Sequence, residues 1–242
     1  MTEAALPAGP VPDELARLAE TALGQVKAAT GAGPVRVGLG SGRAAEAFVR
    51  ALARLVDGGL AVEGVATSAA TAALAGGLGI PVVDLGPELL DLTVDGADEV
   101  DPALDLIKGY GGALVRERIV AAASRRQVIL VTPEKLVPRL GGRGRLPVEI
   151  VPFARALCAR RLEAVGARPR LREARGHPVV TDSGNWIFDC GIEPLDDPAA
   201  YEREVRRIPG VIDTGLFLGT ADTVLLAEAG AVRELRREPP RR

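Results

Sequence analysis

Short apolar runs alternate with helical patterns through the first half of the chain, and this alternation limits the fold more than any other feature. The run Val35–Leu39 predicts a buried strand, and the apolar spacing of residues 44–55 predicts a helix. Further strands are predicted at 60–66, 82–85, 92–94 and 128–131, and further helices at 13–29, 69–78 and 114–124. Strands that alternate with helices form a parallel sheet covered on both faces, so we expect a Rossmann-like α/β domain.

The pattern changes after Lys135, where the Gly- and Arg-rich residues 140–147 (LGGRGRLP) indicate a linker. The segments that follow read as strand 148–151, helix 154–165, strands 170–173 and 186–189, helix 199–208 and strand 211–217. This order is that of a ferredoxin-like unit, and a last strand at 223–227 can return to the first sheet. We therefore expect a Rossmann-like domain of residues 1–146 and 215–242, with a smaller ferredoxin-like α+β domain of residues 147–214 inserted toward the C-terminus.

Charge and hydropathy exclude several classes of partner. The net charge is −2, which argues against a nucleic-acid groove, and residues 233–242 are expected to be a solvated basic end. No apolar run reaches the roughly 18 residues of a membrane span, and the first ten residues do not resemble a signal peptide. We expect a cytoplasmic protein with no nucleic-acid or membrane partner.

The counts of histidine and cysteine limit the chemistry. His177 is the single histidine, so a multi-histidine metal site is excluded, and we expect acid–base chemistry to rest on Asp, Glu and Lys. Cys158 and Cys190 are too few and too far apart to suggest a disulfide framework or a zinc site.

Four predicted strands end in unusual residues. They are the glycine loop (GLGSG, residues 38–42), Thr67–Ser68, the DGAD sequence of residues 95–98, and KGYGG of residues 108–112. In an open parallel sheet, ligands bind beyond the carboxyl ends of the strands. We therefore expect these four segments to converge on one crevice.

The glycine loop does not fit a nucleotide site. Its spacing is G-x-G-x-G, the next strand lacks an acidic residue at its end, and no Gly-Lys-Ser/Thr follows. The amides of Gly40 and Gly42 at the start of a helix suit a small phosphate or sugar phosphate instead. Hydroxyl groups that could assist belong to Ser41, Thr67, Ser68 and Thr71. The glycines alone are equally consistent with a tight turn that binds nothing.

The DGADEVD stretch, residues 95–101, carries four carboxylates. Asp101 precedes a proline and is expected to cap a turn. Asp95 and Asp98 directly follow the strand, and with Lys108 they form a group whose pKa values can be set apart by their neighbours. They could equally hold magnesium, but Lys108 would compete with the metal.

Two further charged residues are ambiguous on sequence alone. Glu117 lies in the first turns of a helix that begins after Gly111–Gly112, and an exposed glutamate paired with neighbouring arginines is the favoured interpretation. Lys135 is likewise more typical of a surface lysine.

Several motifs together resemble the ribose-5-phosphate isomerase family, type A, over roughly residues 13–232. The segments, in order, are VGLGSG, TSAAT, VDGADEVDPALDLIKGYGGALVRERIV, EIVPFA, VVTDSGNWIFDC and IPGVIDTGLFL. The resemblance implies an aldose–ketose isomerase that interconverts ribose 5-phosphate and ribulose 5-phosphate through an enediolate. It also implies a sugar-phosphate substrate, no metal or organic cofactor, and a homodimer or homotetramer.

The same resemblance assigns roles to individual residues. Glu117 matches the family's base, which moves a proton between C1 and C2, and Asp95 and Lys108 match residues of sugar binding and ring opening. Asp98 would orient hydroxyl groups, and Lys135 would bind the phosphate. Lys108 and the amides around Gly111 and Gly112 would stabilise the enediolate.

This chain departs from the family pattern at two places. The usual loop GTGST is Gly40-Ser41-Gly42-Arg43-Ala44 here, and Tyr110 interrupts a run of glycines. Arg43 is expected to replace the lost hydroxyls as a phosphate donor, although it could instead point to solvent.

Two other functions remain open at this stage. One is a sugar-phosphate sensor without catalysis, and the other is a related enzyme of the deaminase or coenzyme A transferase kind. The DGAD and IKGYGGALVRE segments favour the isomerase over both.

Overall fold

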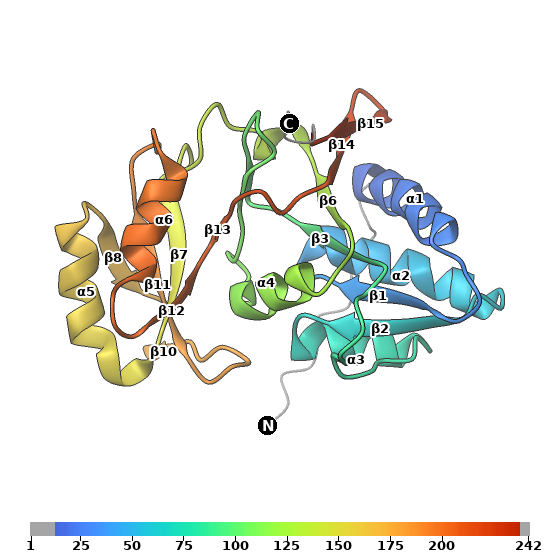
Figure 1. Cartoon of the computed structure of the whole chain (residues 1–242), viewed down its shortest axis with the longest axis horizontal. Coiled ribbons are helices and arrows are strands. Elements are labelled where there is room, and N and C mark those ends of the chain that lie inside the picture. Colours follow the sequence, from blue (N-terminus) through green and yellow to red (C-terminus); the bar gives the residue numbers. More distant parts are fainter. Residues whose placement is uncertain (1–12, 238–242) are drawn as a thin grey trace.

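The larger sheet has six strands in the order β15-β14-β6-β3-β1-β2 (Figure 1). The structure, a computed structural model, describes residues 13–237. The strands are β1 (Val35–Leu39), β2 (Val62–Ala66), β3 (Leu92–Gly96), β6 (Gln127–Val131), β14 (Thr223–Glu228) and β15 (Ala231–Arg236). All neighbours pair in parallel except β14 and β15, so the predicted parallel sheet and the return of the last predicted strand are confirmed.

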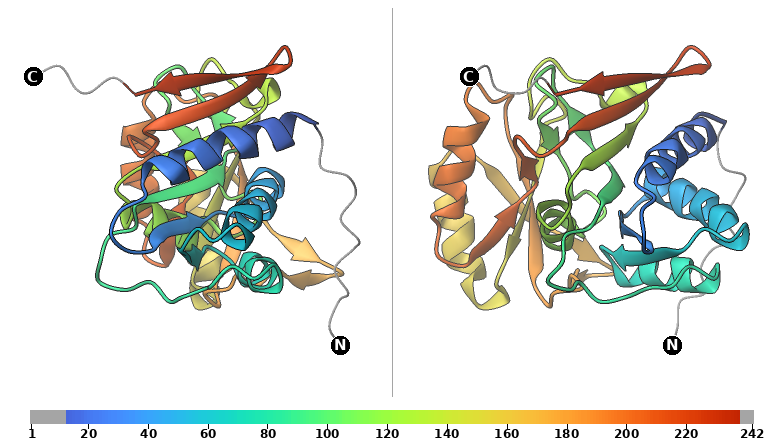
Figure 2. Two further views of the ribbon diagram at one scale, coloured as in Figure 1. Left: turned by 90° about the vertical axis from the view of Figure 1, so that its right-hand side faces the viewer. Right: turned by 45° about the vertical axis from the view of Figure 1, so that its right-hand side comes forward.

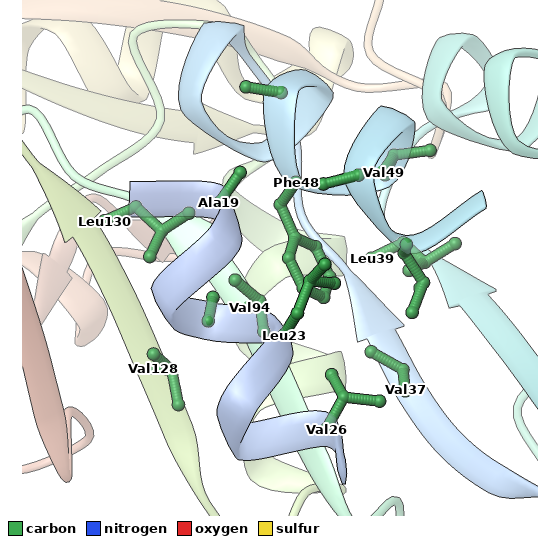
Figure 3. Packing of buried hydrophobic residues seen from close by; sticks show 14 of the residues in the cluster. Ala19, Leu23, Val26, Val37, Leu39, Phe48, Val49, Val94, Val128 and Leu130 are labelled. Carbon is green, nitrogen blue, oxygen red and sulfur yellow. The ribbon is translucent and has the colours of Figure 1, made fainter. Parts of the chain in front are cut away.

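Helices cover both faces of this sheet. They are α1 (Asp13–Ala28), α2 (Arg43–Asp57), α3 (Ala69–Gly77) and α4 (Leu114–Ala122). Leu23 of α1 and Phe48 of α2 pack with Val37 and Val94 in one buried cluster (Figure 3). Val120 of α4 packs against the other face, where a Cβ on Gly38 would lie 2.5 Å from its Cγ1. A glycine at this position therefore lets the helix approach the sheet closely.

The smaller sheet has four antiparallel strands in the order β12-β7-β11-β8. They are β7 (Arg145–Ile150), β8 (Arg168–Leu171), β11 (Trp186–Gly191) and β12 (Val211–Thr214), with helices α5 (Arg155–Ala164) and α6 (Pro198–Arg206). In chain order this is βαββαβ, which confirms the ferredoxin-like topology. The two sheets and their helices lie side by side in Figure 1 and in the right view of Figure 2.

Short elements connect and extend the two sheets. They are β4 (Glu99–Val100), β5 (Leu106–Ile107), β9 (Glu173–Ala174), β10 (His177–Pro178), β13 (Leu216–Phe217) and the 3-10 turns η1 (Pro133–Lys135) and η2 (Pro152–Ala154). Strands β13, β5 and β4 form a small sheet between the two larger ones. No helix within residues 13–237 is long and apolar enough to cross a membrane.

Some predicted elements were wrong. Residues 82–85 form no strand, and only Val82 makes an isolated bridge, because this exposed segment has no partner beyond Gly64. The predicted linker 140–147 overlaps β7, which begins at Arg145. The predicted strand 211–217 is broken at Gly215, where a Cβ would lie 2.3 Å from the Lys108 carbonyl oxygen.

The basic C-terminal segment is also not entirely a solvated end. Residues 231–236 form β15, which pairs with β14 from Thr223 to Glu228. The backbone of an edge strand presents unpaired N–H and C=O groups, and β15 satisfies those of β14. Arg237 pairs with Asp105, and residues 238–242 lie outside the described residues.

Candidate active site

The predicted crevice lies where the strand order of the large sheet reverses, at the carboxyl ends of β1 and β3. A cavity of about 300 Å³ occupies this place. Its wall includes Ser41, Gly42, Arg43, Asp98, Lys108, Gly111, Glu117 and Lys135 among the residues that the sequence predicted. Asp95, Gly40, Thr67, Ser68 and Gly112 are close by but are not part of the wall.

The glycine loop is held by a cluster of hydroxyl groups. Ser41 Oγ lies 2.7 Å from Thr67 Oγ1 and donates to Ser68 Oγ at 2.9 Å. Thr71 Oγ1 donates to the Gly40 carbonyl oxygen at 3.0 Å. These hydroxyls therefore fix the shape of the loop, and Ser41 is the member of this cluster that reaches the cavity.

Two glycines of the loop are required by its geometry. A Cβ on Gly40 would lie 2.3 Å from the carboxyl carbon of Asp95, so only glycine allows β1 and β3 to meet here. Gly42 has a φ of +87°, a conformation that side chains other than glycine rarely adopt. The loop is thus shaped to pass directly over Asp95 into the first turn of α2.

The cavity has a cationic end. Arg43 is exposed at the first position of α2 and lines the cavity beside the helix N-terminus. Lys135 reaches the same cavity from η1 and is only half-buried. Two cations and a helix N-terminus form a typical site for a phosphate group.

Beside the cavity lies a buried group that we call the charged cluster: Asp95, Lys108 and Glu117. Lys108 Nζ lies 2.9 Å from Asp95 Oδ2 and 3.3 Å from Glu117 Oε2. It also donates to the Gly96 carbonyl oxygen at 2.5 Å. The three side chains are only 2–5% exposed. The prediction of an exposed Glu117 paired with arginines is therefore wrong, because the first turn of α4 faces the end of β3.

The two carboxylates of the charged cluster are bound differently. Asp95 Oδ1 accepts from the backbone amides of Ser41 at 3.1 Å and Gly96 at 2.8 Å, so both of its oxygens have partners. Glu117 Oε2 has the ion pair with Lys108 but no hydrogen bond within the described part of the chain. Of the two carboxylates in the cluster, Glu117 is thus the one with a buried oxygen that lacks a hydrogen bond.

Burial and charge shift the pKa values in this cluster. Burial raises the pKa of Glu117 to about 8, and Lys108 opposes this shift. Burial alone would lower the pKa of Lys108, but Asp95 and Glu117 outweigh it and raise the pKa above its usual value. Lys108 is therefore a permanent cation beside a carboxyl group that changes its protonation state near neutral pH.

Asp98 faces the cavity, and its surroundings differ from those of Asp95 and Glu117. Its Oδ2 accepts from the Tyr110 amide at 2.9 Å, and burial raises the pKa of this carboxyl group despite that bond. The Tyr110 ring points away from the cavity: its hydroxyl donates to the Arg145 carbonyl oxygen at 3.1 Å. Tyr110 therefore contributes its backbone to the site and its ring to the small sheet.

The remaining carboxylates of residues 95–101 are structural. Glu99 accepts from the amides of Gly141 at 2.7 Å and Arg143 at 2.9 Å. Asp101 Oδ1 accepts from the amides of Ala103 and Asp105, which confirms the predicted turn. Both residues bind backbone amides rather than a ligand.

No group of three His, Cys, Asp or Glu side chains within residues 13–237 is placed to hold a metal ion. Lys108 Nζ occupies the position beside Asp95 Oδ2 that a magnesium ion would need. Cys158 and Cys190 are free and buried.

Comparison with known proteins identifies the family of this chain. The family described as ribose 5-phosphate isomerase A (phosphoriboisomerase A) matches residues 63–230. The chain belongs to this family. Ribose-5-phosphate isomerase A of Roseiflexus sp. (strain RS-1) is 49% identical over 223 residues, which cover 90% of this chain and 94% of that protein. The one from Thermomicrobium roseum is 50% identical over 204 residues, covering 83% of this chain and 86% of that protein.

Solved structures of the ribose-5-phosphate isomerase A family share the whole fold. The enzyme of Methanocaldococcus jannaschii superposes with a TM-score of 0.85 at 36% identity, covering 93% of this chain and 98% of that chain. A D-ribose-5-phosphate isomerase in complex with phospho-erythronic acid superposes with a TM-score of 0.87 at 35% identity, covering 95% of this chain and 100% of that chain.

Proposed function

We propose that this chain interconverts D-ribose 5-phosphate and D-ribulose 5-phosphate, an aldose–ketose isomerisation of the pentose phosphate pathway. The observation that carries the proposal is Glu117: a buried carboxyl group with a raised pKa, paired with Lys108, at the wall of a cavity with a cationic end. Membership of the family supports the same reaction. It does not favour a sensor without catalysis or a deaminase-like enzyme.

The reaction needs one base that serves two neighbouring carbons. In our proposal Glu117 removes the proton from C2 of the open-chain aldose and returns it to C1. Removal of the C2 proton leaves its electron pair in a new C1=C2 double bond and puts the negative charge on O1, so the intermediate is an enediolate. Transfer of the C2 hydroxyl proton to O1 and return of the carbon-bound proton to C1 then give the ketose. Lys108 lies 3.3 Å from Glu117 and places positive charge where the oxygen becomes negative.

The two aspartates of DGAD are proposed to have different tasks. Asp98 faces the cavity, and its raised pKa suits hydrogen bonds with sugar hydroxyls and the ring oxygen. Asp95 is bound to Lys108 and to two backbone amides, which suits the positioning of Lys108. The proton relay at the ring oxygen that the resemblance implies for Asp95 remains a prediction. Comparing ring-opening rates in Asp95→Asn and Asp98→Asn would tell which carboxyl group relays the proton at the ring oxygen.

The phosphate is proposed to bind at the cationic end. Arg43, Lys135 and the N-terminus of α2 would contact it, and Ser41 lies on the same wall. A relative has been solved with phospho-erythronic acid, a compound that has a phosphate at one end and a carboxylate at the other. The cavity described here offers cations to both ends of such a molecule.

We propose in addition that the protein is cytoplasmic, forms a homodimer or homotetramer, and divides into domains at residues 146/147 and 214/215. Phe153 is fully exposed, and Val151 and Ile212 on neighbouring strand ends are 36% and 40% exposed. Such apolar side chains are typical of protein contacts. Light scattering coupled to size-exclusion chromatography should give twice or four times the monomer mass, and a monomer would refute this part.

A turnover assay on ribose 5-phosphate tests the function. We expect ribulose 5-phosphate to form, and in D2O the C1 position should acquire solvent deuterium as the proton exchanges on Glu117. The same rate is expected after treatment with EDTA. Failure to turn over ribose 5-phosphate would refute the proposal, and loss on EDTA that magnesium restores would refute the metal-free mechanism.

A further inference from the structure

The loop that carries Lys108, residues 108–112, is held from the side of the small sheet. The Lys108 amide donates to the Gly215 carbonyl oxygen at 2.9 Å. The Arg145 guanidinium lies 4.4 Å from the centre of the Tyr110 ring. The loop that reaches into the cavity is thus anchored by residues that do not line it.

Arg172 makes the most extensive of these contacts. It lies between β8 and β9, and its side chain is 12% exposed. Its Nε donates to Asp189 Oδ2 at 3.0 Å and its Nη2 to Asp189 Oδ1 at 2.5 Å, a bidentate pair. Its Nη1 donates to the carbonyl oxygens of Tyr110 at 3.1 Å and Gly109 at 3.4 Å. One rigid guanidinium therefore connects β11 to two successive peptide groups of the loop.

Because peptide groups are planar, the contacts with Arg172 also determine the direction of the N–H groups of Tyr110 and Gly111. In a trans peptide the C=O and the following N–H point in opposite directions. Because the Gly109 C=O faces Arg172, the Tyr110 N–H faces away from it, and it donates to Asp98 at the cavity wall. Because the Tyr110 C=O also faces Arg172, the Gly111 N–H must face away from it too.

The Gly111 N–H differs from its neighbour in one respect. Gly111 is exposed and lines the cavity beside Lys108 and Glu117, and its N–H makes no hydrogen bond to another group within residues 13–237. A backbone donor that is held in place and open to the cavity is suited to an oxygen that becomes negative during a reaction. The Lys108 ammonium and this amide are on the same loop.

We propose that Arg172, fixed by Asp189, is a positioning residue that aims the Gly111 N–H at the oxygen on which the enediolate charge develops. The inference rests on the proposed isomerase function. Arg172 contacts no substrate and acts through the peptide groups of Gly109 and Tyr110. Removal of a donor to a developing oxyanion typically lowers kcat by about 10²-fold, which is the loss expected here.

The test compares Arg172→Met with Arg168→Met in the whole protein. Arg168 is on β8, its side chain is 64% exposed, and its partner is Glu193, so it is a matched arginine away from the loop. For each variant we would measure kcat and KM for ribose 5-phosphate, and inhibition constants for phospho-erythronic acid and inorganic phosphate. In the proposed site, the carboxylate of the first inhibitor would lie where the enediolate oxygens form, and the second would occupy only the cationic end.

We expect Arg172→Met to lower kcat by about 10²-fold and to weaken phospho-erythronic acid by at least tenfold. KM and inhibition by phosphate should stay within about threefold of the wild type, and Arg168→Met should behave as the wild type. If Arg172→Met keeps kcat within threefold, or weakens both inhibitors equally, the inference is wrong. If the wild type itself does not turn over ribose 5-phosphate, the proposed function fails instead.

Arg172→Lys covers the case in which the methionine variant does not fold. A lysine keeps the charge, but its single ammonium cannot hold Asp189 and two carbonyl oxygens in one plane. Arg172→Lys should also lower kcat while leaving KM nearly unchanged, and its loss of kcat should be smaller than that of Arg172→Met. If neither variant folds, as judged by circular dichroism, Arg172 has a structural role only and the inference is refuted.

Discussion

The glycine loop and the charged cluster face the same cavity but are built in opposite ways. In the glycine loop neutral groups satisfy one another: Ser41, Thr67 and Ser68 form a closed set of hydroxyl contacts. In the charged cluster three ionisable side chains are almost fully buried, and Glu117 Oε2 lacks a hydrogen bond. The first arrangement stabilises the fold, whereas the second keeps a buried carboxyl group in an unfavourable environment.

This difference separates binding from reaction. A loop with satisfied hydrogen bonds presents a fixed anion site and needs no change of protonation. A carboxyl group whose pKa burial raises to about 8 is a stronger base when ionised, but its ionised form costs stability. Substitutions in the glycine loop should therefore change KM, and substitutions of Glu117 should change kcat. Their effects on the free energy of unfolding should have opposite signs.

The largest effect is expected from Glu117→Gln. Glutamine has nearly the same shape but cannot accept the proton from C2, so kcat should fall by about 10³-fold or more. KM should change little, because the phosphate end remains intact. A steady-state assay on ribose 5-phosphate measures both constants. Turnover at the rate of the wild type would show that another group is the base.

The same variant should be more stable than the wild type at high pH. A carboxyl group with a raised folded pKa contributes stability that is complete below its unfolded pKa near 4.5 and is lost as the pH rises through about 8. Glu117→Gln removes this loss, and Lys108 keeps its partner Asp95. At pH 9 the free energy of unfolding should rise by something on the order of 1–3 kcal/mol.

Thermal or urea unfolding of the wild type and Glu117→Gln at pH 5 and pH 9 measures this difference in the free energy of unfolding. The gain should shrink toward pH 5, where the wild-type carboxyl group is already neutral. A variant that is less stable than the wild type at pH 9 would mean that the ion pair with Lys108 outweighs burial.

The two regions also differ in how far the sequence predicts them. Every member of the charged cluster follows a strand end or a glycine pair, and the topology rule brings such ends together. The burial of Glu117 was not predictable from the residues, because it depends on which side of α4 meets β3. The resemblance to the family singled out Glu117 as the base but said nothing of its burial.

The supporting contacts were missed altogether. Arg172 is 63 residues from Gly109, which it holds, and Asp189 is farther still along the chain. Nothing in their local sequence distinguishes them from other pairs of charges. The same holds for β15, whose exposed and charged residues give little strand signal. The parallel order of the strands was predictable from the apolar periodicity, whereas contacts between the two sheets depend on how they pack.

The charged cluster should also determine how activity depends on pH. Glu117 must be ionised to act as base, so kcat/KM should fall about tenfold per unit as the pH drops below about 8. Lys108 stays protonated over this range, because Asp95 and Glu117 raise its pKa. The profile is best measured between pH 6.5 and 9, above the second pKa of the phosphate ester near 6. A flat profile there would contradict the raised pKa of Glu117.

The smallest effect is expected at the phosphate end, where Arg43 stands in place of the family's hydroxyls. Arg43→Met should raise KM for ribose 5-phosphate by about tenfold and weaken inhibition by inorganic phosphate by the same factor. Its kcat should stay within about threefold, because the charged cluster is untouched. Arg54→Met is the matched control, since Arg54 is on the same helix and pairs with Glu20 outside the cavity. If both variants keep the KM of the wild type, Arg43 points to solvent, and Lys135 with the N-terminus of α2 must hold the phosphate.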